Sequence, residues 1–106
     1  MAVGGIRVMA DRAVEVTVRG IVQGVGFRWF ASRQAGRSGL AGWVVNQADG
    51  SVFVVAQGEA GAVDRFVGAL REGPPGASVS AVEVVERAVT GLADRFEIRS
   101  GAHRGD

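Results

Sequence analysis

The chain has 106 residues, of which 47% are hydrophobic, and a formal net charge of +1, which suits one small globular domain with a single core. It contains no cysteine, which excludes disulfides, thiolate nucleophiles and cysteine metal sites, and its one histidine, His103, lies in a polar terminal stretch, which argues against a histidine base or a multi-histidine metal site. The near-neutral charge indicates neither a nucleic-acid partner nor a membrane partner.

The ends of the chain carry no targeting pattern. No apolar run reaches the length of a membrane span, and residues 1–10 lack the long apolar region and cleavage site of a secretory signal. We therefore expect a cytoplasmic protein. Residues 1–12 and 100–106 are expected to be a flexible extension and a flexible tail around one domain at 13–99.

A strand and a glycine-rich turn open the domain. Val14, Val16 and Val18 alternate with polar residues, which predicts a half-buried strand with its valines inward. Three glycines then fall within Gly20–Gly26, and the spacing becomes helical from Phe27 onward. This helix is expected to end at the glycines at positions 36 and 39.

The remaining elements follow in a regular alternation. Apolar runs at 40–46 and 52–57 flank turn residues that include Asp49-Gly50, which predicts a β-hairpin. Apolar residues with helical spacing between Val63 and Leu70 predict a second helix, stopped by a Gly-Pro-Pro-Gly sequence. Two further strands are expected at 79–86 and 96–98.

The order of these elements is βαββαβ with a short extra segment at the end. Two helices on one face of a mainly antiparallel sheet form a ferredoxin-like α+β sandwich, and that is the predicted fold class.

The segment Gly20–Arg28 is the strongest candidate for a binding site. A glycine-rich turn between a strand and a helix directs several backbone N–H groups at one point, near the positive end of the helix dipole. Arg28 adds a guanidinium suited to phosphate oxygens. The segment lacks the Lys-Ser/Thr of a P-loop after its last glycine, and it lacks the third glycine of a dinucleotide loop.

Asn46 is the second candidate residue. Asparagine is common at hairpin ends, and that explanation suffices on local evidence alone. In the predicted sandwich, however, the second strand can return past the end of the first and bring Asn46 near the glycine loop. A neutral amide there can hold a water molecule, because it both donates and accepts hydrogen bonds.

Two stretches closely resemble the signatures of the acylphosphatase family. They are Gly20-x-Val22-Gln23-Gly24-Val25-Gly26-Phe27-Arg28 and, in the same order and spacing, Gly39-Leu40-x-Gly42-Trp43-Val44-x-Asn46-x-x-Asp49-Gly50-Ser51-Val52. The similarity extends over about residues 14–99 and includes the Gly-Pro-Pro after the second helix and the final Phe-x-Ile.

The resemblance implies a small acylphosphatase, a metal-independent hydrolase that cleaves the carboxyl–phosphate bond of acyl phosphates without a cofactor. It implies that Arg28 and the loop residues bind the phosphoryl group, or inorganic phosphate and other anions, and that Asn46 orients the attacking water. The phosphate-binding residues would be Gln23, Gly24, Val25, Gly26, Phe27 and Arg28. Positioning and charge stabilisation would supply most of the catalysis. We expect a monomer.

Some positions depart from the usual family pattern, and two alternative functions stay open. Ala31 and Gln47 stand where hydroxyl residues are frequent, which could lower the rate.

The first alternative is a non-catalytic domain that binds acyl phosphate or carbamoyl phosphate, since similar domains occur inside larger proteins. The second is RNA binding, but the strand around Phe53 offers one aromatic residue where RNA-recognition domains of this fold carry three.

Overall fold

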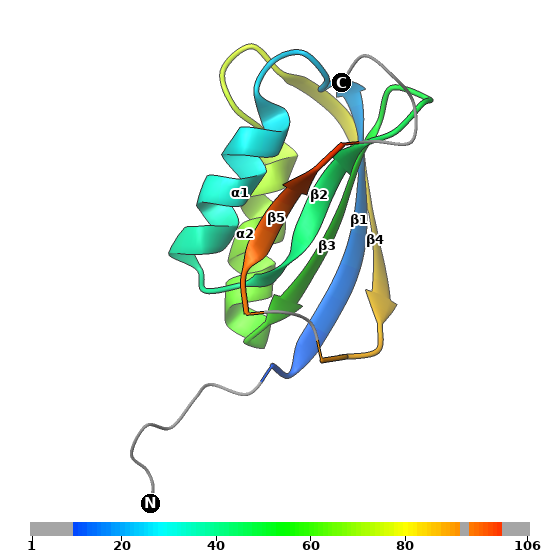
Figure 1. Cartoon of the computed structure of the whole chain (residues 1–106). Coiled ribbons are helices and arrows are strands. Elements are labelled where there is room, and N and C mark those ends of the chain that lie inside the picture. Colours follow the sequence, from blue (N-terminus) through cyan, green and yellow to red (C-terminus); the bar gives the residue numbers. More distant parts are fainter. Residues whose placement is uncertain (1–9, 92–93, 101–106) are drawn as a thin grey trace, which may run out of the picture.

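The computed structural model describes residues 10–91 and 94–100 of the chain (Figure 1). Most of the two terminal segments expected to be flexible, residues 1–9 and 101–106, lies outside the described residues, and so does His103.

The described chain is a five-stranded sheet with both helices on one face, as Figure 1 shows. The strand order is β4-β1-β3-β2-β5, in which β5 runs parallel to β2 and the other neighbours are antiparallel. The predicted fold class is therefore confirmed. The elements are β1 (Arg12–Ile21), α1 (Phe27–Arg37), β2 (Ala41–Asn46), β3 (Val52–Gly58), α2 (Ala60–Glu72), β4 (Ser78–Arg87) and β5 (Phe96–Arg99).

The core lies between the helices and the sheet. Val14, Val16 and Val18 are completely buried and point toward the helices, as their alternation predicts. From α2 the same core receives the apolar stripe that includes Phe66 and Leu70, also fully buried or nearly so. Burying each such side chain contributes about 1.5–3 kcal/mol relative to an exposed one, so this layer fixes the positions of both helices.

The boundaries differ from the expected ones at two places. Helix α1 continues through Gly36 and ends at Arg37, because Gly39, with φ of 67°, makes the turn that lets Leu40 N–H reach the Ala35 carbonyl. Strand β1 begins at Arg12, two residues before the alternating valines.

The backbone of Arg12 pairs with Gly58 on β3, which extends the strand to this residue. The Arg12 guanidinium forms ion pairs with Asp64 on α2 and with Glu86 on β4. The side chain therefore joins the first residue of β1 to the helix above it and to the neighbouring strand.

Gly42 on β2 lies at a close approach between the backbones of β2 and β3. Its φ is 143°, and a Cβ atom at this position would collide with the backbone carbonyl of Val55 on β3. We expect Gly42→Ala to lower the free energy of unfolding by about 3 kcal/mol, because it adds backbone strain and overpacking together. Urea unfolding followed by circular dichroism measures this change.

Gly68→Ala is the matched control. Gly68 lies within α2 with open space around its Cα atom, so alanine there should raise the free energy of unfolding by about 0.5–1 kcal/mol. Equal effects of the two substitutions would contradict the close approach of β2 and β3.

Candidate active site

A pocket of about 240 Å³ opens where the loop after β1 meets the start of α1 and the ends of β2 and β5. It brings together residues that lie far apart in the sequence, and it includes both sequence-predicted catalytic candidates. The lining residues are Val22, Gly24, Gly26, Phe27, Arg28, Trp29, Asn46 and Ile98.

The glycine-rich loop forms one wall of the pocket. Gly24 and Gly26 have φ angles of 77° and 79°, a left-handed conformation that other residues rarely adopt. Gly26 is the N-cap of α1 and has no side chain to offer, and its carbonyl accepts the first helical hydrogen bond, from Phe30 N–H at 3.0 Å. The N–H groups of the first helical turn have no partner within the helix. They and the helix dipole favour an anion here.

Val25 and Phe27 connect this loop to the hydrophobic core. Phe27 is buried in the core, and Val25 packs against it half-buried. These two residues can reach an anion only through their backbone N–H groups, whereas their side chains anchor the loop to the protein interior.

Arg28 lies on the first turn of α1 and is one of the residues that line the pocket. One guanidinium nitrogen, Nη1, donates a hydrogen bond to the backbone carbonyl of Arg99 at 2.9 Å. This contact joins the helix to β5, the strand that also carries Ile98. A guanidinium offers five N–H donors in a planar arrangement, so contact with β5 is compatible with simultaneous contact with an anion.

Asn46 is the last residue of β2, and its side chain is only 5% exposed. It pairs in register with Val52 on β3 and belongs to the same pocket as Arg28. Its Oδ1 atom is buried and has no hydrogen-bond partner among the described residues. A buried carbonyl oxygen without a partner costs about 1–3 kcal/mol, so this atom is an acceptor suited to the O–H of a water molecule.

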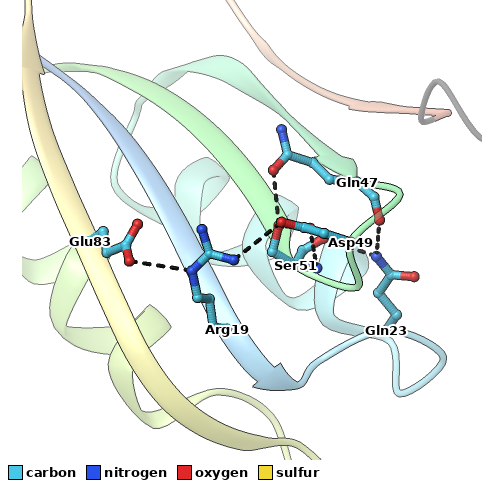
Figure 2. Close-up of polar contacts among 6 residues, drawn as sticks. All are labelled: Arg19, Gln23, Gln47, Asp49, Ser51 and Glu83. Atoms are coloured by element: carbon cyan, nitrogen blue, oxygen red, sulfur yellow. Dashed lines mark hydrogen bonds and ion pairs between the residues drawn. The ribbon is translucent and has the colours of Figure 1, made fainter.

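Gln23 has a role that the sequence does not indicate. Its Nε2 atom donates two hydrogen bonds to the hairpin, to the backbone carbonyl of Gln47 at 2.7 Å and to that of Ser51 at 2.9 Å (Figure 2). The side chain therefore fastens the glycine loop to the turn that follows Asn46. Glutamine is suited to this position because one amide nitrogen can donate to two carbonyls.

The turn itself is held by a second set of polar contacts, also drawn in Figure 2. Ser51 donates its backbone N–H (3.0 Å) and its hydroxyl (2.6 Å) to Asp49 Oδ1. Arg19 on β1 contacts Asp49 at 3.2 Å and Glu83 on β4 at 3.3 Å. These contacts tie the turn to two strands. The hydrogen bonds from Ser51, and then Arg19, lower the pKa of Asp49 from 3.8 to about 2.

Trp29 and Ile98 complete the rim of the pocket. Trp29 follows Arg28 on the first turn of α1. Ile98 was expected only as part of the last strand, and nothing in its local pattern indicates a place in a pocket. Only the parallel pairing of β5 with β2 brings it there.

No group of three or more histidine, cysteine, aspartate or glutamate side chains in the described part of the chain could hold a metal ion. Within the same residues, no helix has the length and apolar character needed to cross a membrane.

The fold and the pocket define a class of protein: an α+β sandwich whose pocket is lined by a glycine loop, an arginine and a buried asparagine. The Acylphosphatase family model matches residues 14–98 of the chain. The chain belongs to the acylphosphatase family.

Two relatives show how far this similarity extends. An acylphosphatase of Paraburkholderia xenovorans is 51% identical over 90 residues, which cover 82% of this chain and 93% of the relative. The crystal structure of acylphosphatase from Bacillus subtilis aligns with a TM-score of 0.81 and 40% identity, covering 84% of this chain and 99% of that one. The comparisons support a catalytic acylphosphatase, a hydrolase, over a non-catalytic accessory domain.

A third comparison is with part of a larger protein. Full-length HypF, in its phosphate- and nucleotide-bound form, aligns with a TM-score of 0.79 and 30% identity. The match covers 88% of this chain and only 12% of HypF. The same fold therefore also occurs as a small part of a much longer chain.

The lowered pKa of Asp49 predicts how its contribution to stability depends on pH. A carboxylate with a folded pKa below its unfolded value stabilises the fold above the unfolded value, about 3.9. This stability is lost as the pH falls through the folded pKa of about 2. We expect Asp49→Asn to be less stable than the unmodified chain near neutral pH, with the difference shrinking from about pH 4 to about pH 2.

Urea unfolding of both chains at a series of pH values measures this difference. A difference that stayed constant over the acidic range would show that Asp49 does not gain its hydrogen bonds as a carboxylate, and would contradict the contacts drawn in Figure 2.

Proposed function

We propose that this pocket hydrolyses the carboxyl–phosphate bond of small acyl phosphates, with Arg28 and Asn46 as its catalytic residues. The observation that carries the proposal is that both side chains line one pocket above the glycine loop, and that the buried Asn46 Oδ1 has no partner among the described residues. The chain's membership of the acylphosphatase family supports the same reaction.

Binding of the phosphoryl group uses the loop and the arginine. The backbone N–H groups from Gln23 to Arg28 surround the phosphoryl oxygens, and the Arg28 guanidinium adds charge-assisted hydrogen bonds. Inorganic phosphate and similar anions bind in the same place. Because these donors are held by the helix and by the contact of Arg28 with the Arg99 carbonyl, little reorganisation accompanies the reaction.

The chemical step needs a positioned water molecule. Asn46 accepts a hydrogen bond from that water through Oδ1 and directs its oxygen toward phosphorus. The new P–O bond forms as the bond between phosphorus and the acyl oxygen breaks, and the carboxylate leaves with the electron pair. The proton of the water passes to a phosphoryl oxygen of the substrate. Orientation of this kind can supply several kcal/mol of the barrier.

We propose that the reaction uses neither a metal ion nor an organic cofactor. The carboxylate leaving group needs no general acid. Arg28 and the N-terminus of α1 supply the positive charge that stabilises the negative phosphoryl oxygens in the transition state. Hydrolysis in the presence of excess chelator tests this part of the proposal directly.

The alternative is a non-catalytic domain that binds an acyl phosphate or carbamoyl phosphate. This alternative is suggested by HypF, in which a similar fold forms a small part of a longer chain. The retention of both Arg28 and Asn46 in one pocket favours turnover instead. Binding of phosphate without hydrolysis of any acyl phosphate would support the alternative.

We also propose that the protein works as a monomer in the cytoplasm. Light scattering during size-exclusion chromatography measures its mass in solution, and cell fractionation measures its location.

Two substitutions separate binding from turnover. Arg28→Ala removes charge-assisted contacts to the phosphoryl group, so we expect kcat/KM for acetyl phosphate to fall at least about 100-fold and inhibition by inorganic phosphate to weaken.

Asn46→Ala removes the water acceptor, so we expect kcat to fall by about 100-fold or more with little change in inhibition by phosphate.

Arg37→Ala is the control for loss of positive charge, because Arg37 lies on the last turn of the same helix. It should leave both parameters unchanged. Activity that survived either Arg28→Ala or Asn46→Ala, or that required an added metal ion, would overturn the proposed mechanism.

A further inference from the structure

Two large apolar side chains line the active-site pocket while remaining strongly exposed. Trp29 is 59% exposed and Ile98 is 45% exposed, whereas most apolar residues of the domain are buried in the core. Exposed apolar surface that borders a polar site frequently marks the part of a pocket that contacts a ligand. The phosphate-binding groups do not require these side chains.

Both side chains are held beside the pocket by other contacts. The guanidinium of Arg33, one helical turn after Trp29, lies 4.7 Å from the centre of the Trp29 ring and stacks on it. Ile98 precedes Arg99, whose carbonyl accepts the hydrogen bond from Arg28. The hydrogen bond between Arg28 on α1 and Arg99 on β5 therefore holds the neighbouring residues, Trp29 and Ile98, beside the pocket.

The pocket is larger than a phosphoryl group. Its volume of about 240 Å³ has room for more than the four oxygens of a phosphoryl ester, each of which is about the size of one water molecule. The rest lies beside apolar side chains, and an acyl chain bonded to the phosphoryl group must leave the loop through this part.

We infer that Trp29 and Ile98 form an apolar subsite for the acyl group, so that the enzyme prefers acyl phosphates with a bulky apolar or aromatic acyl chain over acetyl phosphate. This inference rests on the proposed function. Contact with Trp29 and Ile98 favours a benzoyl group over an acetyl group because more apolar surface leaves water. Trp29 and Ile98 determine specificity and take no part in the transfer of the phosphoryl group.

Trp29→Ala tests the subsite through the ratio of two substrates. We expect kcat/KM for benzoyl phosphate to fall about tenfold, while kcat/KM for acetyl phosphate changes less than about twofold. Trp29→Phe, which keeps an aromatic ring, should retain most of the preference. Val85→Ala is the matched control, because Val85 is a 58% exposed apolar residue on β4, outside the pocket, and it should change neither parameter.

Direct binding separates this inference from the proposed function. Calorimetry with benzoylphosphonate and acetylphosphonate, which are not hydrolysed at the acyl bond, should show about tenfold weaker binding of the benzoyl compound to Trp29→Ala and unchanged binding of the acetyl compound. If neither acyl phosphate is hydrolysed but this pattern of binding holds, the subsite stands and the proposed reaction fails.

The opposite results overturn the inference. Equal losses for the benzoyl and acetyl compounds would show that Trp29 supports the whole site, and no loss for either would show that the acyl group does not contact it. In both cases hydrolysis that depends on Arg28 would leave the proposed function intact.

Discussion

The active-site geometry depends on two hydrogen bonds from one side chain. Gln23 Nε2 donates to the carbonyls of Gln47 and Ser51, and so holds the glycine loop against the hairpin turn. This link is a direct polar tie between the glycine loop and the hairpin turn after Asn46, in addition to the packing of α1 against the sheet. Each carbonyl also accepts a backbone hydrogen bond within the turn, Ser51 from Gln47 N–H and Gln47 from Gly50 N–H. Loss of the Gln23 amide would therefore leave the turn intact and remove its link to the loop.

This arrangement suits a reaction in which the protein mainly positions the substrate and a water molecule, and in which no side chain acts as a nucleophile or general acid. An acyl phosphate carries its own good leaving group, so the protein must hold the phosphoryl group, stabilise its charge and place one water molecule. The loop and Arg28 lie on one wall of the pocket, and Asn46 lies at the end of β2. The contacts among Arg19, Asp49 and Ser51 keep the turn after Asn46 in place.

Local patterns in the sequence predict the fold, which the structure confirms. The catalytic roles of Arg28 and Asn46 follow from the resemblance to the family and stay predictions, although the structure places both residues in one pocket. Alternating valines, glycine positions and the Asp-Gly turn each follow from backbone preferences that act over a few residues. The function of Gln23 and the place of Ile98 could not be predicted in this way. Each depends on contacts across the sheet or between segments far apart in the chain, in the case of Ile98 on the parallel pairing of β5 with β2.

A crystal structure with inorganic phosphate bound would test the central claim most directly, namely that one pocket joins phosphate binding by the loop to a water held by Asn46. We expect the phosphate within hydrogen-bond distance of the Arg28 guanidinium and the loop N–H groups, and a water molecule between Asn46 Oδ1 and the phosphorus atom. Phosphate bound elsewhere, or an Asn46 side chain turned away from the bound phosphate, would contradict the account.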